Sequence, residues 1–201
     1  WGGMMPGRIE SFFTEAGIKQ IFISPDLNYA GAAHADKWIP VLPNTDAALQ
    51  CAIAYVWMDE GLYDREWVEA HSVGFDWFEH YILGNEDGVP KTPAWAAPIC
   101  GVPARQIKAL ARYWAKHSVS IGHCAGGGLI RAAYSSEPAR LEVCLLTMQS
   151  LGKPGAGQIN FMDLGLFGID DIYPLPRSEC QPDMNSVYHG WAMLTEPVNF
   201  I

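Results

Sequence analysis

The hydrophobic positions of this chain predict two short strands. Residues 18–23 form a mainly apolar run between Gly17 and Ser24-Pro25, and residues 118–123 alternate before becoming apolar. Runs of this length are typical of buried parallel strands. Pro25 should end the first strand, because proline has no N–H to donate to a neighbouring strand. We therefore expect two buried strands whose carboxyl ends open on one side.

Longer stretches of the chain have helical spacing. Apolar positions at i, i+3, i+4 and i+7 predict a helix between Pro6 and Gly17. A second helix is expected from residues 44–46 to about Glu60, with Gly61 as its stop. Further helices are expected from Asp64 and over residues 75–81, 93–100, 103–117 and 136–151. Strands that alternate with helices predict an α/β fold, here a Rossmann-like parallel sheet flanked by helices.

Composition suggests where the chain divides. Its 201 residues are 49% hydrophobic, enough for one substantial core. Residues 1–157 carry the predicted elements and are interpreted as one α/β domain, incomplete at its N-terminus because no strand precedes the first glycine loop. Residues 158–201 have little periodicity and are interpreted as an irregular connection toward the next part of a larger, multidomain subunit. The chain opens on Trp1, so we expect an internal piece of a longer protein.

The charge balance argues against some partners. The net charge is −9, and the 13 Lys and Arg residues are scattered, so there is no basic footprint for a phosphate backbone. Nucleic acid is therefore not an expected partner.

No apolar run approaches the roughly 20 residues needed to cross a bilayer, and no signal-peptide pattern opens the chain. We expect a soluble, cytoplasmic protein with no membrane partner.

The cysteines do not predict a metal site. There are five, they are far apart in the sequence, and no C-x-x-C pair occurs, so neither zinc nor an iron–sulfur cluster can be assigned by spacing. We expect most of them to be reduced and buried. His123 beside Cys124 could suggest a metal ligand or a nucleophile, but no third ligand follows at usable spacing. His123 is therefore interpreted as structural or as a simple hydrogen-bond donor.

Two glycine-containing loops are candidates for ligand binding. Trp1-Gly2-Gly3-Met4 leads into the first helix, whose N-terminus would present free N–H groups to a phosphate. The alternative is a tight turn with no ligand. The second loop, from Gly122 through Gly126, contains successive glycines after a strand, which allow positive φ or the close approach of another group.

Acidic residues follow the first strand and open the second helix. Asp26 lies just past residues 18–23 and 23 residues after Gly3 (26 − 3), close to the spacing of glycine loop and acidic residue in nucleotide-binding folds. Asn44, Thr45 and Asp46 precede the second helix, so any of them could cap it. The Asp46 carboxylate could equally accept paired hydrogen bonds from the N1–H and N2–H₂ donors of a guanine. Both roles remain open for Asp46.

These motifs together resemble the catalytic subunit of the DMSO reductase family, whose enzymes carry molybdenum or tungsten on a bis(molybdopterin guanine dinucleotide) cofactor. The match runs through most of the chain. Residues 1–5 resemble the family's W-G-x-N-x loop, with Met4 where Asn is usual. Ser24-Pro25-Asp26 resembles its post-strand nucleotide loop, and residues 43–49 resemble P-G-T-D-A-A-L, with Asn44 in place of Gly. Residues 60–66, 91–96 and 100–103 are similar to further family signatures.

Residues 126–131, 137–142 and 151–155 look most like the branch that contains pyrogallol-phloroglucinol transhydroxylase and acetylene hydratase. That branch implies hydroxyl transfer or hydration of a small organic substrate, in an enzyme class that is otherwise mainly oxidoreductases. An iron–sulfur electron-transfer subunit is a candidate partner. Molybdenum and tungsten are not distinguished.

The resemblance implies that this part of the enzyme grips the cofactor. The family's metal ligand and any iron–sulfur cysteines lie N-terminal to the matched part, so no catalytic residue and no metal ligand is assigned here, and any iron–sulfur cluster would lie elsewhere in the full-length protein. The cofactor-binding residues implied are Trp1, Gly2, Gly3, Met4, Ser24, Pro25, Asp26, Asn44, Thr45, Asp46, Gly122 and Gly126.

Two other hypotheses compete with this one. The first is an α/β module that binds NAD or a similar nucleotide, which residues 2–7 disfavour because they do not form G-x-G-x-x-G. The second is a structural subunit that has lost its site. The full-length sequence upstream of Trp1 would distinguish the three hypotheses, since only a molybdopterin enzyme is expected to have a metal-ligating region there.

Overall fold

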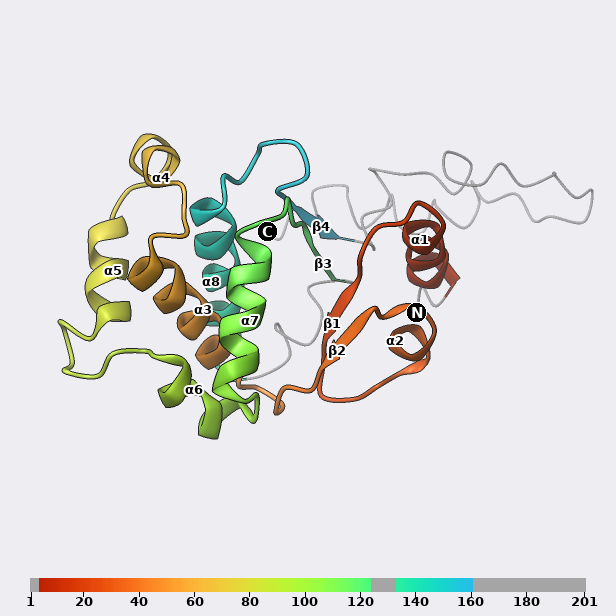
Figure 1. Cartoon of the computed structure of the whole chain (residues 1–201), viewed down its shortest axis with the longest axis horizontal. Helices are drawn as coiled ribbons and strands as arrows, with labels where there is room; N and C mark the ends of the chain where they lie inside the picture. Colours follow the sequence, from red (N-terminus) through yellow and green to blue (C-terminus); the bar gives the residue numbers. More distant parts are fainter. Residues whose placement is uncertain (1–3, 124–132, 161–201) are drawn as a thin grey trace, which may run out of the picture. The chain divides into compact units, whose positions relative to one another are not determined.

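The computed structural model describes residues 4–123 and 133–160, which lie in the first of two compact units, Trp1–Asp163 (Figure 1). The described residues form helices and short strands in alternation, as expected of an α/β fold. In chain order the elements are α1 (Met4–Glu15), β1 (Ile21–Ile23), α2 (Tyr29–His34), β2 (Lys37–Ile39), α3 (Asp46–Glu60), α4 (Arg65–His71), α5 (Phe75–Leu83), α6 (Pro93–Cys100), α7 (Ala104–Trp114), β3 (Ile121–His123), α8 (Ser136–Met148) and β4 (Gln158–Asn160).

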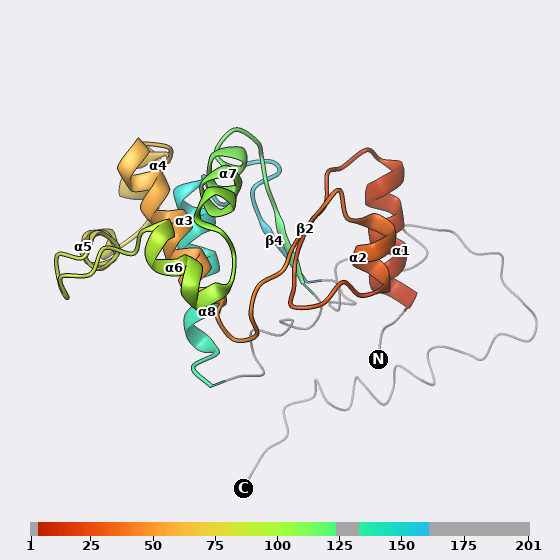
Figure 2. The same ribbon diagram turned by 60° about the horizontal axis from the view of Figure 1, so that its bottom comes forward.

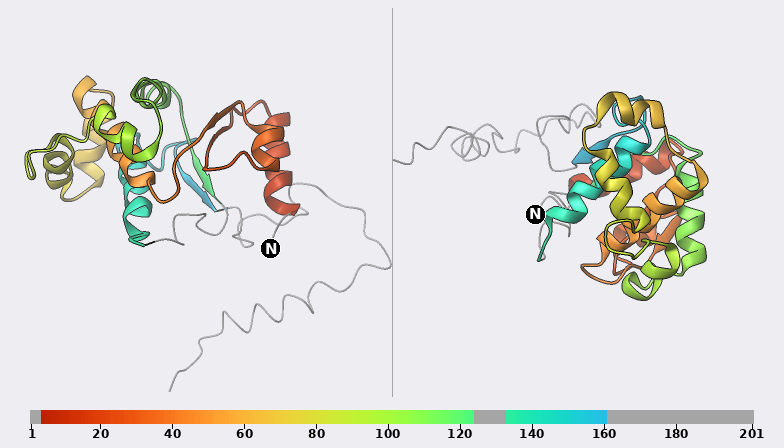
Figure 3. Two further views of the ribbon diagram at one scale, coloured as in Figure 1. Left: turned by 90° about the horizontal axis from the view of Figure 1, so that it is seen from below. Right: turned by 90° about the vertical axis from the view of Figure 1, so that its left-hand side faces the viewer.

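Helix α3 is the centre of the hydrophobic core. It packs against α5, α6, α7 and α8, which lie around it in the two views of Figure 3. Residues 48–54, 56 and 57 of α3 are all buried. Ala52, Ala54 and Trp57 have no exposed surface. A helix that is apolar on every side is typical of a central position, and the small side chains of α3 let its neighbours approach closely.

Helix α7 is amphipathic and lies within the predicted residues 103–117. Ile107, Leu110, Ala111 and Trp114 are buried. On its outer side Arg112 makes two hydrogen bonds of 2.8 Å to the Glu60 carboxylate at the end of α3. Gly61, in the left-handed conformation at φ 63°, then ends α3 as expected. Asp64 caps α4 as predicted by accepting a hydrogen bond from the Trp67 amide at 3.0 Å.

The strands form two parallel pairs. β1 pairs with β2, aligning Ile21 with Lys37, and β3 pairs with β4, aligning Ile121 with Gln158. Parallel pairing in an α/β fold is confirmed, but within the described residues the two pairs are separate sheets. Among the described residues each strand therefore has a neighbouring strand on one side only.

The predicted strands are longer and more buried than the observed ones. Residues 18–20 precede β1 and residues 118–120 precede β3, and both Ile18 and Ile23 are exposed. Gln20 explains the late start of β1, because its amide binds the Asp36 carboxylate at 2.9 Å and its carbonyl accepts from the Asp36 amide at 2.9 Å. An apolar run indicates a strand but does not show which neighbours cover it.

Two short elements were missing from the sequence-based prediction. No helix was predicted for residues 29–34, which form α2; Asn28 caps this helix by accepting a hydrogen bond from the Gly31 amide at 2.9 Å. Helix α2 lies beside α1 (Figure 2), and Thr14 contacts His34 at 3.0 Å between them. Strand β4 falls in the stretch predicted to be irregular from residue 158. Elements of three to six residues are too short to show periodicity. The domain division at residue 157 stays a prediction.

Candidate functional site

A cavity of about 770 Å³ lies at the N-terminus of α3, within the size range usual for small-molecule sites. Its walls come from β1 and the loop after it, the loop before α3, one side of α3, the end of α7, residues 119–122 and α8. Half of the residues that the sequence predicts for cofactor binding line it: Ser24, Pro25, Asp26, Asn44, Asp46 and Gly122.

The loop after β1 is held by short polar contacts. The Ser24 hydroxyl donates to the Asp26 carbonyl oxygen at 2.7 Å, which closes a tight turn around Pro25. The Trp38 indole donates to the Ser24 carbonyl oxygen at 3.1 Å, which ties the turn to β2. Asp26 itself is exposed, so its carboxylate is accessible at the edge of the cavity.

The loop before α3 explains the asparagine at position 44. Asn44 has φ 62°, in the left-handed region that favours glycine and that asparagine tolerates best among the other residues. The position at which the P-G-T-D-A-A-L pattern has Gly is thus occupied by the residue best able to replace it.

Thr45 stands at the N-cap position of α3 but does not cap it with its side chain. Its hydroxyl donates instead to the Leu42 carbonyl oxygen at 2.6 Å. Of the three candidate caps, Thr45 therefore occupies the N-cap position, but its hydroxyl turns back into the loop. Thr45 is also absent from the cavity lining, unlike its neighbours Asn44 and Asp46.

Asp46 is the first residue of α3 and is half-buried in the cavity wall. Burial raises the pKa of its carboxyl group, and a hydrogen bond to its own backbone amide offsets part of this effect. Among the described residues no cation or side-chain donor pairs with this carboxylate. A desolvated carboxylate without a partner, facing a cavity, is typical of a ligand-binding position.

Three buried polar side chains of the cavity wall were not selected from the sequence. Gln50 and Trp114 are buried, and within the described part of the chain the Gln50 Oε1 and the Trp114 Nε1 have no hydrogen-bond partner. Glu142 on α8 is buried and accepts a hydrogen bond from the Gln158 side chain at 2.7 Å. The signal for Gln50 was its place one helical turn after Asp46 in an otherwise apolar stretch. Trp114 and Glu142 gave no comparable signal.

Five further predicted positions lie at or beyond the limits of the described residues. Trp1, Gly2, Gly3 and Gly126 lie outside the described residues, and Met4 is described only as the first residue of α1. Whether Gly126 lies at the same edge as Asp26 therefore stays a prediction. The described member of that loop, Gly122, lines the same cavity as Asp26, which supports it.

The described cysteines behave as expected. Cys51 and Cys100 are buried free thiols, and burial raises the pKa of Cys51 to about 12. Cys51 therefore stays protonated near neutral pH. No group of three or more His, Cys, Asp or Glu side chains suited to a metal ion occurs in the described ranges.

The same ranges contain no helix long and apolar enough to cross a membrane.

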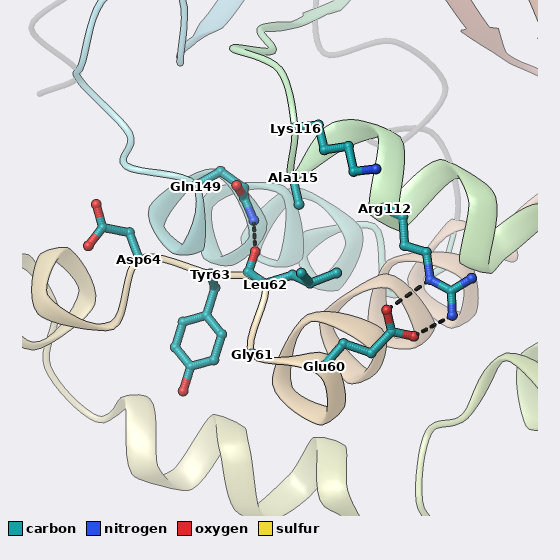
Figure 4. A pocket seen from close by; sticks show the side chains of 9 residues that line it. All are labelled: Glu60, Gly61, Leu62, Tyr63, Asp64, Arg112, Ala115, Lys116 and Gln149. Carbon is teal, nitrogen blue, oxygen red and sulfur yellow. Dashed lines mark hydrogen bonds and ion pairs between the residues drawn. The ribbon is translucent and has the colours of Figure 1, made fainter.

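A second cavity, of about 560 Å³, lies at the opposite end of α3 (Figure 4). Its main polar groups are already paired within the protein. Arg112 binds Glu60, the Gln149 amide donates to the Leu62 carbonyl oxygen at 2.8 Å, and Asp64 binds Lys153 at 2.8 Å. The cavity beside Asp46 is therefore the better candidate, because Asp46, Gln50 Oε1 and Trp114 Nε1 in its wall have no partner among the described residues.

No protein-family model matches the sequence. The chain is 45% identical over 145 residues to the pyrogallol hydroxytransferase large subunit of Pelobacter acidigallici, an alignment that covers 71% of this chain and 17% of that protein. It is 41% identical over 124 residues to the dimethyl sulfoxide reductase DmsA of Haemophilus influenzae, covering 55% of this chain and 15% of that protein. The chain belongs to the DMSO reductase family of molybdopterin enzymes.

A solved structure agrees with this placement in the family. Acetylene hydratase from Pelobacter acetylenicus matches 68% of this chain with a TM-score of 0.52 and 25% sequence identity. The match covers 18% of that enzyme, so the chain spans less than a fifth of the length of these three relatives. By name these relatives are a hydroxytransferase, a reductase and a hydratase, which confirms the family resemblance seen in the sequence.

Proposed function

We propose that this chain holds the guanine end of a bis(molybdopterin guanine dinucleotide) cofactor in a molybdenum or tungsten enzyme. The observation that carries the proposal is Asp46, a half-buried carboxylate without a partner among the described residues, in the wall of a cavity of about 770 Å³. A carboxylate accepts two parallel hydrogen bonds, which matches the adjacent N1–H and N2–H₂ donors of guanine.

The residues around the cavity fit such a ligand. Two buried polar atoms of its wall, on Gln50 and Trp114, have no partner in the described part of the protein, and buried polar atoms are normally paired. The turn at Ser24 to Asp26 offers an acidic group after a strand, the place where open α/β sheets bind nucleotides. Gly122 contributes backbone but no side chain to the cavity wall, which leaves more room for a ligand. These features support a nucleotide with several donors and acceptors.

The remaining predicted residues belong to the same proposal. Trp1, Gly2, Gly3 and Met4 precede or begin α1, and Gly126 follows β3; we assign them to the cofactor's phosphates and pterin through the family resemblance. We also propose that the two parallel strand pairs belong to one Rossmann-like arrangement within a multidomain subunit. The parallel direction of both pairs supports this arrangement.

In such enzymes the metal and pterin supply the chemistry when bound, and the protein binds, orients and shields them. The relatives support an oxidoreductase, or a hydroxyl transferase or hydratase, that acts on a small organic substrate. An iron–sulfur electron-transfer subunit and a cytoplasmic location complete the proposal for the whole enzyme. The metal ligand would come from outside this chain.

Metal and nucleotide analysis of the full-length protein tests the proposal. We expect molybdenum or tungsten, with about two guanine nucleotides released by acid for each metal atom. Bound NAD without either metal would contradict it and favour an NAD-type module.

The Asp46→Asn variant tests the base-reading role. Asparagine keeps the shape of the side chain but places a donor where guanine needs an acceptor, so the purified enzyme should retain roughly tenfold less guanine nucleotide. Asp59→Asn is the matched control, because Asp59 is an exposed carboxylate at the other end of α3. A loss of stability in the cofactor-free protein with unchanged cofactor content would show that Asp46 serves only the helix.

A further inference from the structure

Gln50 lies one helical turn after Asp46 on α3, and both side chains line the cavity. Residues four apart on a helix share a face, so the two polar groups are neighbours on the same wall. Gln50 is 9% exposed, and its Oε1 has no donor among the described residues. The cavity wall beside it is otherwise apolar on α3, since Leu49 and Ile53 line it too.

An unpaired buried oxygen at this position destabilises the folded, cofactor-free protein. A leucine would fill similar space without leaving a polar atom unpaired, so packing alone does not explain glutamine here. A buried polar group that is unsatisfied in the empty protein and faces a cavity is instead suited to a ligand that brings the missing donor.

The chemistry of the ligand identifies that donor. The edge of guanine that faces a carboxylate has three hydrogens, one on N1 and two on the exocyclic 2-amino group. The two oxygens of Asp46 accept the N1 hydrogen and one amino hydrogen, which leaves the outer amino hydrogen. We propose that Gln50 Oε1 accepts this third hydrogen, so that Gln50 selects bases with a 2-amino group; the inference rests on the proposed function of Asp46.

A neutral acceptor suits this position better than a second acid. Two carboxylates four residues apart on one helix face repel each other, whereas a carboxamide oxygen accepts a hydrogen bond without added charge. Burial already raises the pKa of Asp46. A second carboxylate would raise that pKa further and reduce the charged form that binds the base.

Binding of two free nucleotides to the cofactor-free, full-length enzyme tests the inference. The probes are guanosine diphosphate and inosine diphosphate, whose base lacks the 2-amino group. We expect the wild type to bind the guanosine nucleotide roughly thirtyfold more tightly, because the 2-amino group donates to both Asp46 and Gln50. Gln50→Leu should reduce this preference to roughly fivefold, the part that Asp46 supplies, while Asp46→Asn should weaken the binding of both nucleotides.

Thermal stability of the same variants separates binding from packing. Gln50→Leu should raise the melting temperature of the cofactor-free protein, because it removes an unpaired buried oxygen. Gln149→Leu is the matched control: it removes the bond to the Leu62 carbonyl, remote from the cavity, and should lower stability without changing the nucleotide preference. An unchanged guanosine preference in Gln50→Leu, with Asp46→Asn still impaired, would overturn the inference alone. A wild type that binds neither nucleotide, or an Asp46→Asn variant that binds as the wild type, would overturn the proposed function as well.

Discussion

The indole N–H of Trp57 donates to the Ala111 carbonyl oxygen at 2.7 Å, and the Trp57 ring meets Trp114 edge to face with centroids 5.0 Å apart. This contact joins α3 to α7 in the core. Both helices also line the candidate site, α3 with Asp46 and α7 with Trp114. The spacing of two cavity walls therefore depends on a buried pair beneath them.

Trp57→Phe should destabilise the protein by about 2 to 4 kcal/mol, because it leaves the Ala111 carbonyl without its donor and opens space in the core. Trp77→Phe is the control, since Trp77 on α5 is 80% exposed and its replacement should change stability by less than about 0.5 kcal/mol. Urea denaturation of both variants measures the difference. Equal effects would contradict the central place of Trp57.

The left-handed conformation of Asn44 predicts an unusual order of substitutions. Asn44→Gly should be close to neutral, because glycine adopts φ 62° without a steric penalty. Asn44→Ala should cost about 1 to 2 kcal/mol, because a Cβ without a compensating polar group is strained there. Thermal denaturation of the cofactor-free protein distinguishes them. If alanine were tolerated better than glycine, the backbone at residue 44 would not be left-handed.

The raised pKa of Asp46 predicts how the empty protein responds to pH. Burial places the folded-state pKa above the unfolded value, so the folded protein binds more protons in that window and loses stability as pH rises through it. The cofactor-free Asp46→Asn variant should therefore be at least as stable as the wild type at neutral pH. The difference should shrink as pH falls through the folded pKa. Melting temperatures from about pH 4 to about pH 7 measure it.

The pKa of Asp64 is shifted downward, opposite to the shift of Asp46. The Lys153 ammonium, the Ser150 hydroxyl and the Trp67 amide together lower its pKa to about 2. A depressed carboxyl pKa stabilises the folded state above the unfolded value of 3.8, and this contribution disappears as pH falls toward 2. The gap in melting temperature between the wild type and Asp64→Asn should be widest near neutral pH and close in acid. Lys153→Met should remove part of the same gap; if it removes none, the ammonium is not the main cause.

Lys91 is a buried cation, 2% exposed, between α5 and α6. Its ammonium donates to Asp87 Oδ2 at 2.5 Å and to the Val89 carbonyl at 2.6 Å, and lies 4.4 Å from the centre of the Tyr81 ring. Asp87→Asn should cost about 2 to 4 kcal/mol, because it leaves that charge buried. Lys91→Met should cost less, about 1 to 2 kcal/mol, because the Asp87 side chain is 42% exposed and water can solvate it. A double-mutant cycle checks the asymmetry, and equal costs would contradict it.

The sequence predicted the longer helices and their ends well, because periodicity and caps are local signals. Gly61 and Asp64 mark helix ends where expected, and α7 lies within the predicted residues 103–117. The length and burial of the strands were not predictable, since they depend on partners distant in the sequence. Lys91 shows the same limit, because nothing local indicates that a lysine will be enclosed by a carboxylate and two aromatic rings.

The candidate site was found in part through its loops. Asp26, Asn44 and Asp46 stood out because turn residues and acids interrupt apolar stretches, and they do line one cavity. Gln50, Trp114 and Glu142 were not selected, because their position in helices makes them look like ordinary surface or core residues. Thr45 was chosen by spacing, but the direction of its hydroxyl depends on the fold of the loop.

The walls of the cavity beside Asp46 come from segments that leave the ribosome at very different times, from Ile21 in β1 to Leu145 in α8. A growing chain that ends before α8 has Asp46 and Gln50 but lacks the part of the wall that Glu142 and Leu145 contribute. Domains fold as units once their sequence has emerged, so a guanine nucleotide has no enclosed place to bind during synthesis of the first half. We therefore expect the nucleotide to enter a chain that has already folded, with the mouth of this cavity as its route.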